Sequence, residues 1–367
     1  MLLAVSALWL MDLGVVADLG LLVVVFPLCL RYLISVPITH TDAVQRFTLV
    51  LLGLYVLVTL WSPSATGLKR TVGIMAAFAI YSYFRDRASV LRSSRALLWA
   101  SLLLAITTIG LVVSPLPLPK NTAGGIVAYQ ILTFTYVLSC RRGKTRSRIL
   151  TLGWVSLCLA AIMLDHRTLA ALACLAVLVT ATLAHVRRRG LLVRAVWSGS
   201  LAAAIAVVAV VALPQGSDVL ERIDESATEA TGRTLNSGRQ EIWPIVIGQI
   251  GERPILGWGT AAEASDFTGL PLSAHNLFLQ VGLQVGLAGV AVLLMLFWGI
   301  WRVASRVFDP VSRPYAQGLT VFVFFHSLSE VFLFQNSLGI GLSFWALLGL
   351  VLGPSPESFA STGYEEQ

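Results

Sequence analysis

Charged side chains are scarce in this chain. Asp, Glu, Lys and Arg make up 12% of its 367 residues, whereas hydrophobic residues make up 56%. A soluble globular domain has about twice this charged fraction. Many windows of about 20 residues carry no charge, and a helix of that length crosses the hydrocarbon core of a bilayer. The composition therefore excludes an ordinary soluble domain and predicts an all-α, polytopic bundle of transmembrane helices.

Metal-binding and targeting patterns are also lacking. None of the cysteines has the spacing of metal ligands, and no disulfide framework is indicated. The four are Cys29, Cys140, Cys158 and Cys174. The N-terminus has neither a basic n-region nor a cleavage site of small residues, so we expect no removable signal peptide.

The apolar segments predict 11 transmembrane helices, or 12 if residues 1–12 add a short one. The predicted spans are 13–36, 47–61, 67–84, 96–114, 124–140, 147–163, 167–185, 191–213, 276–301, 315–333 and 337–353. The chain thus divides into a membrane region (1–213), one long connection (214–275) and a second membrane region with a tail (276–367). Every other connection is short.

The net charge of +7 comes from arginine and lysine gathered in alternate connections. These basic connections are 85–95, 141–148, 187–189 and 302–313. Such alternation follows the positive-inside rule and indicates that these connections are cytoplasmic. The basic excess is therefore a topology signal, and we expect no nucleic-acid partner. The 214–275 connection falls on the external side.

The external connection is predicted to be partly helical. One helix begins after Ser217, in DVLERIDES, and a second lies in SGRQEIWPIVIGQIGERP. The second places Arg239 and Trp243 on one face, and Pro244 is expected to kink it or to start a new helix. The following PILGWGT contains Gly257 and Gly259, which predict a tight turn that lets the backbone approach a neighbour closely.

This connection ends at His275, which opens the next apolar helix. Asn276, Gln280 and Gln284 form a polar stripe beneath it, and such amides need partners away from water. The glycines at 282, 286 and 289 lie on another face, where small residues allow close packing between membrane helices. A histidine in this position has two possible interpretations, a structural residue at a helix end or a reactive group.

Three further ionisable residues are candidates. His326 and Glu330 are four residues apart on one face of an apolar helix, either as a functional pair or as a pair that satisfies itself. Arg167, two residues after Asp165, begins a span from the outer side. An interfacial arginine whose side chain reaches the headgroups is the alternative explanation for Arg167.

Together these residues resemble a known family. His275 and Asn276, then nine residues, Gly286, two residues and Gly289 form a pattern similar to that of bacterial O-antigen ligases. The preceding Arg239 and Trp243, with PILGWG after them, are similar to the long-loop pattern of the same superfamily. The resemblance covers 237–289 best. It departs from the family at Arg167, where the local sequence is Asp-His-Arg-Thr.

The resemblance implies a GT-C-like membrane glycosyltransferase in the bacterial cytoplasmic membrane, with its site facing the periplasm. The donor would be a glycan on undecaprenyl diphosphate, and the acceptor a sugar hydroxyl of lipid A-core or another glycan. His275, Arg239 and Arg167 would be catalytic. The substrate-binding residues would be Asn276, Trp243, Glu330, His326 and Gln280.

The chemistry of these residue types fits this role. Guanidinium groups can hold a diphosphate leaving group, and a neutral histidine can accept the proton of a sugar hydroxyl. The chain has no compact acidic motif for a metal, so we expect a metal-independent reaction without a cofactor.

Other functions stay open at this point. A polymerase that joins repeat units on the lipid carrier would use the same donor chemistry. A transporter or flippase of lipid-linked saccharides would show internal repeats and broken helices, and no clear repeat is evident. A structural membrane protein would leave the placement of His275, Arg239 and Glu330 to coincidence.

Overall fold

The computed structural model describes five stretches of the chain and several single residues. The stretches are 41–93, 239–270, 273–307, 312–335 and 338–354; the single residues are Pro27, Leu30, Arg31, Ile34, Tyr129, Leu132, Thr133 and Tyr136. Every regular element in these stretches is an α-helix, which confirms the all-α prediction there. Six of the predicted spans lie outside the described residues, except for the single residues just named. These spans are 13–36, 96–114, 124–140, 147–163, 167–185 and 191–213. The helix predicted after Ser217 also lies outside the described residues.

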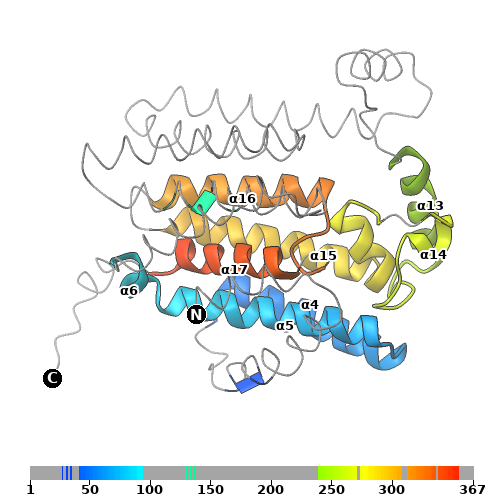
Figure 1. Cartoon of the computed structure of the whole chain (residues 1–367), viewed down its shortest axis with the longest axis horizontal. Coiled ribbons are helices and arrows are strands. Elements are labelled where there is room, and N and C mark those ends of the chain that lie inside the picture. The colour runs from blue at the N-terminus through cyan, green and yellow to red at the C-terminus, as the bar shows by residue number, and fades with distance from the viewer. Residues whose placement is uncertain are drawn as a thin grey trace, which may run out of the picture.

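Five long helices lie side by side (Figure 1). They are α4 (Ala43–Trp61), α5 (Ala65–Asp86), α15 (Leu277–Arg306), α16 (Ser312–Ser329) and α17 (Leu338–Leu352). Each helix coincides with a predicted span, and the observed and predicted ends differ by only a few residues. α15 packs against α4 and α16, while α5 packs against α4 and α17.

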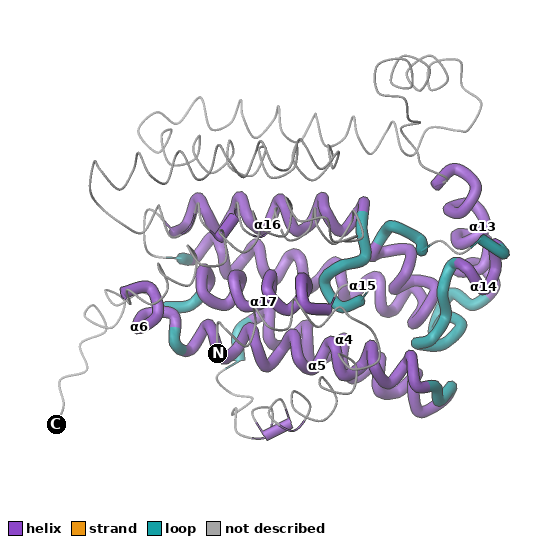
Figure 2. Tube along the Cα trace, in the orientation of Figure 1, coloured by secondary structure: helices purple, strands orange, loops and turns teal. Residues whose placement is uncertain are grey.

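Shorter helices lie at the two ends of this bundle. α6 (Ala88–Ser93) lies at one end, and α13 (Arg239–Glu252) and α14 (Ser265–Thr268) lie at the other (Figure 1). The loops that join α13, α14 and α15 gather at that same end (Figure 2). α13 continues through Pro244, so the predicted start of a new helix there is wrong. Pro244 lies in the second turn, and only one intrahelical hydrogen bond is lost at this position.

Two of the described helices, α4 and α15, are long and apolar enough to cross a membrane. Both also leave large apolar side chains uncovered: Trp61 and Leu57 on α4 are 87% and 55% exposed, and Leu287 on α15 is 55% exposed. Contiguous exposed apolar surface suits contact with lipid rather than water. These helices support a membrane protein, while the number of spans and the GT-C-like fold stay predictions.

The backbone of α15 is interrupted inside the membrane-length helix. Val285 has φ −130° and ψ 17°, and Gly286 has φ 71° and ψ −171°. Neither pair of angles is helical, so backbone groups on both sides lose their helical partners. The loop 254–259 takes up three of these groups. The amide of Leu287 donates to Pro254 O (2.7 Å), Trp258 N donates to Leu283 O (2.8 Å), and Gly259 N donates to Gln284 O (3.2 Å).

Glycines make this close approach possible. Gly257 has φ 66°, and a Cβ there would lie 2.6 Å from the carbonyl oxygen of Leu283. A Cβ at Gly286 would lie 2.2 Å from the carbonyl oxygen of Ile255. The predicted close approach of the PILGWG turn is therefore confirmed. The prediction that Gly286 serves helix–helix packing is wrong, because this glycine faces the loop and requires a positive φ.

The other side of the loop is held by α5. Arg70 is buried, and its Nη1 donates to the carbonyl oxygens of Thr260 (2.7 Å) and Ala262 (3.1 Å). Its Nη2 donates to the Glu263 carboxylate at 2.5 Å. One arginine thus fixes the four-residue stretch 260–263. The segment 254–263 is therefore held between α5 and the break in α15.

We expect Gly286→Ala to destabilise the protein by about 1–3 kcal/mol, because alanine would be strained at a positive φ and its Cβ would overlap the Ile255 carbonyl. Thermal unfolding in detergent measures the effect. Gly248→Ala is the matched control, since a Cβ at Gly248 has no atom within 4 Å. Equal midpoints for the two variants would contradict the tight loop–helix contact.

Candidate functional site

His275 lies in the last turn of loop before α15 and has an unusual backbone conformation. Its φ is 46°, in the left-handed region that non-glycine residues rarely adopt. Two hydrogen bonds involving the preceding residues hold the backbone there. The His275 amide donates to the Ser273 hydroxyl at 3.3 Å, and the Trp243 indole Nε1 donates to the Ala274 carbonyl at 2.8 Å. Such strain is typical of positions where a side chain must point in a defined direction.

Asn276 is the N-cap of α15. Its side-chain oxygen accepts hydrogen bonds from the amides of Phe278 (2.9 Å) and Leu279 (3.1 Å). These are two of the amide groups that the first turn of a helix leaves without partners. Asn276 therefore fixes the start of α15 one residue after His275.

The imidazole of His275 contacts a carboxylate from another helix. Its Nδ1 lies 3.3 Å from Oε2 of Glu330, and the two side chains are 22% and 20% exposed. Glu330 follows the last residue of α16, so it lies just outside that helix. An ionised carboxylate only accepts hydrogen bonds, which favours the tautomer with the proton on Nδ1. The lone pair is then on Nε2, the nitrogen away from Glu330.

Glu330 is kept ionised by its surroundings. Burial alone raises the pKa of this carboxyl. The hydrogen bond with His275 and the charge of Arg239 lower it, so the pKa lies below its usual value. A carboxylate that stays ionised can stabilise a positive charge that develops on His275.

Arg239, the first residue of α13, reaches the same place. Its Nη2 donates to the carbonyl of Ser329, the last residue of α16, at 3.1 Å. Its Nε is buried and has no hydrogen-bond partner among the described residues. Burial lowers the pKa of this guanidinium while the charge of Glu330 raises it, and an arginine stays protonated even so. A buried cation with an unused donor is suited to an anionic ligand.

His326 lies beneath this group and is only 2% exposed. Its ring is stacked on Phe322 at 5.5 Å between centroids and contacts Phe332 at 4.1 Å. Its carbonyl accepts the Glu330 amide at 2.8 Å. The carboxylate of Glu330 bonds to His275, an arrangement that spacing along the sequence did not indicate.

The polar stripe of α15 is satisfied within the protein. Gln280 Nε2 donates to the carbonyl of Ala262 at 2.9 Å. Gln284 exchanges two hydrogen bonds with Gln335, at 2.9 and 2.7 Å, and accepts one from the Tyr55 hydroxyl at 2.7 Å. The stripe therefore binds the loop and two neighbouring segments together. Gln280, a predicted substrate-binding residue, is placed against the loop.

Arg167 lies outside the described residues. Among the other site candidates, the structure brings His275, Glu330 and Arg239 together, with Trp243 holding the backbone beside His275. Sequence reasoning missed Arg70, which positions the loop. The signal was present, because Arg70 is an ionisable residue inside a predicted apolar span.

Comparison with known proteins bears on this geometry. Residues 152–294 match the family model described as O-antigen ligase. A curated protein of Rickettsia prowazekii (strain Madrid E), named "Putative polysaccharide ligase RP358", is 28% identical over 123 residues. The resemblance to O-antigen ligases is confirmed. That similarity covers 30% of this chain and 29% of the relative, so the chain spans well under half of the relative's length.

The O-antigen ligase match coincides with most of the site. It contains Arg167, Arg239, Trp243, His275, Asn276 and Gln280. Glu330 and His326 lie beyond its end, so the contact between Glu330 and His275 comes from the structure alone.

We expect Asn276→Ala to lower stability by about 1 kcal/mol through loss of the cap, and Asn276→Asp to keep stability, because Asp also caps helices. Thermal unfolding in detergent compares the two. If Asn276→Asp is stable but fails in a functional assay, the amide group of Asn276 binds substrate in addition to capping the helix, as the sequence resemblance implies.

Proposed function

We propose that this protein is a membrane glycosyltransferase of the O-antigen ligase type. It transfers a glycan from an undecaprenyl diphosphate-linked donor to a sugar hydroxyl of lipid A-core, at the outer face of the bacterial cytoplasmic membrane. The observation that carries the proposal is the convergence of a base, a carboxylate and a cation at one end of the bundle. His275 precedes α15, Glu330 follows α16, and Arg239 begins α13.

We assign the Arg239 guanidinium to stabilising the diphosphate leaving group. As the bond between the anomeric carbon and the diphosphate oxygen breaks, its electron pair leaves with the diphosphate. The buried Nε of Arg239 has no hydrogen-bond partner in the described part of the chain and can donate to a phosphate oxygen, with a terminal nitrogen as a second donor. Arg167 is proposed as a second guanidinium for this anion. Because arginine can carry this charge, we propose that the reaction needs no divalent metal and no cofactor.

His275 serves the acceptor. Its Nε2 accepts the proton of the sugar hydroxyl while the hydroxyl oxygen bonds to the anomeric carbon. The ring becomes positively charged in this step, and the ionised Glu330, 3.3 Å from Nδ1, stabilises that charge. Glu330 also selects the tautomer that has its lone pair on Nε2. This division of roles follows the general logic of a histidine base oriented by a carboxylate.

The remaining predicted substrate-binding residues support the site in different ways. Trp243 uses its indole N–H to hold the Ala274 carbonyl, so we propose that it meets substrate through its ring. Asn276 and Gln280 hold the helix start and the loop. The carbonyl oxygen of His326 accepts the Glu330 amide at 2.8 Å, so we propose that His326 acts through the position of Glu330.

A polymerase acting on the lipid carrier would have the same donor site and is the first alternative. A flippase is the more distant one. The broken helix α15 is a feature of transporters, but three backbone groups at its break are bonded to the loop 254–259. The break is therefore satisfied by the protein itself, which removes the need for a transported substrate or ion at these groups.

Transfer assays with purified protein test the proposal. The protein is incubated with an undecaprenyl diphosphate-linked glycan and either lipid A-core or a second lipid-linked glycan, and mass spectrometry identifies the acceptor that gains mass. A gain by lipid A-core supports the ligase, and a longer lipid-linked glycan indicates the polymerase. No gain by either acceptor would overturn the proposal. Loss of transfer in EDTA with recovery in Mg²⁺ would overturn the metal-independent reaction.

Arg239→Lys is expected to lose most transfer activity although the charge is kept. Lysine presents a single ammonium group, whereas the planar guanidinium can donate two parallel hydrogen bonds to a phosphate. A loss of about 10²-fold in kcat/KM would match removal of one donor to a developing anion. Arg253→Lys is the matched control, because Arg253 is exposed and stacks on Trp258. Equal rates for the two variants would exclude the phosphate-binding role of Arg239.

His275→Ala is expected to lower kcat by about 10²–10⁴-fold, the usual contribution of a general base, while donor binding is kept. Glu330→Gln should lower kcat by a smaller factor, since the imidazole stays but loses its charged partner. Glu241→Gln, at an exposed position on α13, is the control. Single-turnover transfer separates the chemical step from donor binding. Normal turnover by His275→Ala would show that His275 is only a helix-end residue.

A further inference from the structure

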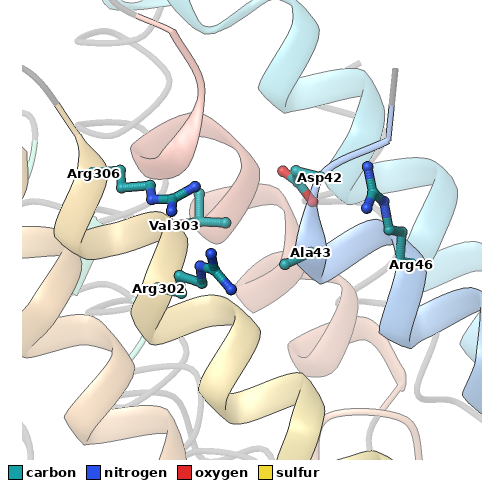
Figure 3. Close-up of a pocket in the computed structure, with 6 residues that line it drawn as sticks. All are labelled: Asp42, Ala43, Arg46, Arg302, Val303 and Arg306. Atoms are coloured by element: carbon teal, nitrogen blue, oxygen red, sulfur yellow. The ribbon is translucent and has the colours of Figure 1, made fainter. Parts of the chain in front are cut away.

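A second candidate site lies at the other end of α15. A cavity of about 380 Å³ is formed between the beginning of α4 and the end of α15 (Figure 3). It is lined by Asp42, Ala43, Arg46, Arg302, Val303 and Arg306. A helix rises 1.5 Å per residue, so the cavity lies roughly 40 Å along α15 from His275. It belongs to a different end of the molecule from the proposed transfer site.

The cavity carries a concentrated positive charge. Arg302 and Arg306 extend from α15 toward α4, where Arg46 lies on the opposite side (Figure 3). The carboxylate of Asp42 does not neutralise them, because it is already engaged. It pairs with Arg85 Nε at 2.8 Å and accepts from the Tyr81 hydroxyl at 2.8 Å.

Few groups of the described chain offset the positive charges of these arginines. No carboxylate in the described parts of the chain forms an ion pair with Arg46, Arg302 or Arg306. Arg46 donates through Nε to the Thr41 carbonyl at 3.0 Å, and Arg302 lies 5.1 Å from the ring of Trp298. Three guanidinium groups around one cavity repel one another, and an anion between them removes that repulsion.

An exposed apolar strip begins where the arginines end. On α15, Leu294, Met295 and Trp298 are 49%, 41% and 53% exposed. Trp298 is one turn before Arg302, so it and Met295 lie on the face of α15 that carries Arg302. A charged cavity continuous with an apolar strip fits an amphiphile, whose head is anionic and whose tail is apolar. A free phosphate ion would use only the cavity.

We propose that this cavity binds the phosphate headgroup of an anionic phospholipid, with its acyl chains along the Leu294–Trp298 face of α15. Guanidinium groups bind phosphate oxygens with paired, charge-assisted hydrogen bonds. The basic connection 302–313 is predicted to be cytoplasmic, where basic clusters beside membrane helices meet anionic lipid. The bound lipid would join the ends of α4 and α15 in the leaflet opposite the transfer site.

Native mass spectrometry of the detergent-purified full chain tests this site. The protein is mixed with phosphatidylglycerol or phosphatidylcholine, and the fraction that keeps one lipid is measured. Wild type should retain phosphatidylglycerol preferentially. The double variant Arg302→Gln/Arg306→Gln should bind it about 25-fold more weakly, about fivefold for each charge removed. Arg87→Gln is the control, because Arg87 is an exposed arginine over a tyrosine ring that does not line the cavity.

Each outcome decides the proposal. Selective loss in the double variant, with retention in Arg87→Gln, supports the lipid site. Equal phosphatidylglycerol retention by wild type and the double variant overturns it. Inorganic phosphate at equal concentration serves as a further arm. If it displaces the lipid completely, the cavity is a site for free phosphate and the lipid assignment is wrong. Arg46→Gln checks the α4 side and should weaken binding about fivefold on its own.

Discussion

The break in α15 and the loop that fills it are the contact on which the site depends. Inside a membrane-length helix, an unpaired backbone group costs several kcal/mol unless protein or water satisfies it. Here the loop 254–259 bonds to three such groups, with distances from 2.7 to 3.2 Å. The residues that follow, 260–263, are held by Arg70. The long connection is therefore anchored in the bundle at residues 254–263, before the chain reaches His275.

This anchoring explains how a residue on a loop can have a defined orientation. The helix start is fixed by Asn276, and the backbone before it is fixed by the Trp243 indole. Between these two points His275 adopts its left-handed conformation and meets Glu330 from another helix. A catalytic group needs this kind of support, because small displacements of the reacting atoms reduce rates strongly.

The sequence predicted the long described helices and named His275, Arg239 and Glu330 as candidates because their signals are local. The start of α15 was predicted at 276 and is observed at Leu277, since an N-cap precedes an apolar run. The break at Gly286 was not predicted, because glycines at this spacing also suit helix packing, and the loop that requires the break lies about 30 residues earlier. Similarly, Glu330 was assigned to His326 by spacing, whereas its carboxylate contacts His275, 55 residues away in sequence.

The amide pair of Gln284 and Gln335 with Tyr55 has a consequence for the order of the bundle. Apolar helices in lipid can slide along one another with little change in buried area, because lipid chains are as apolar as their side chains. A shift of α4 or α15 by one helical turn would separate the Tyr55 hydroxyl from Gln284 and leave buried amides without partners. These three side chains therefore fix the register of α4, α15 and the segment after α16 along the bundle axis. A sequence with leucine at position 284 would keep the helices but lose this register. The alignment of His275 with Glu330 would be lost with it.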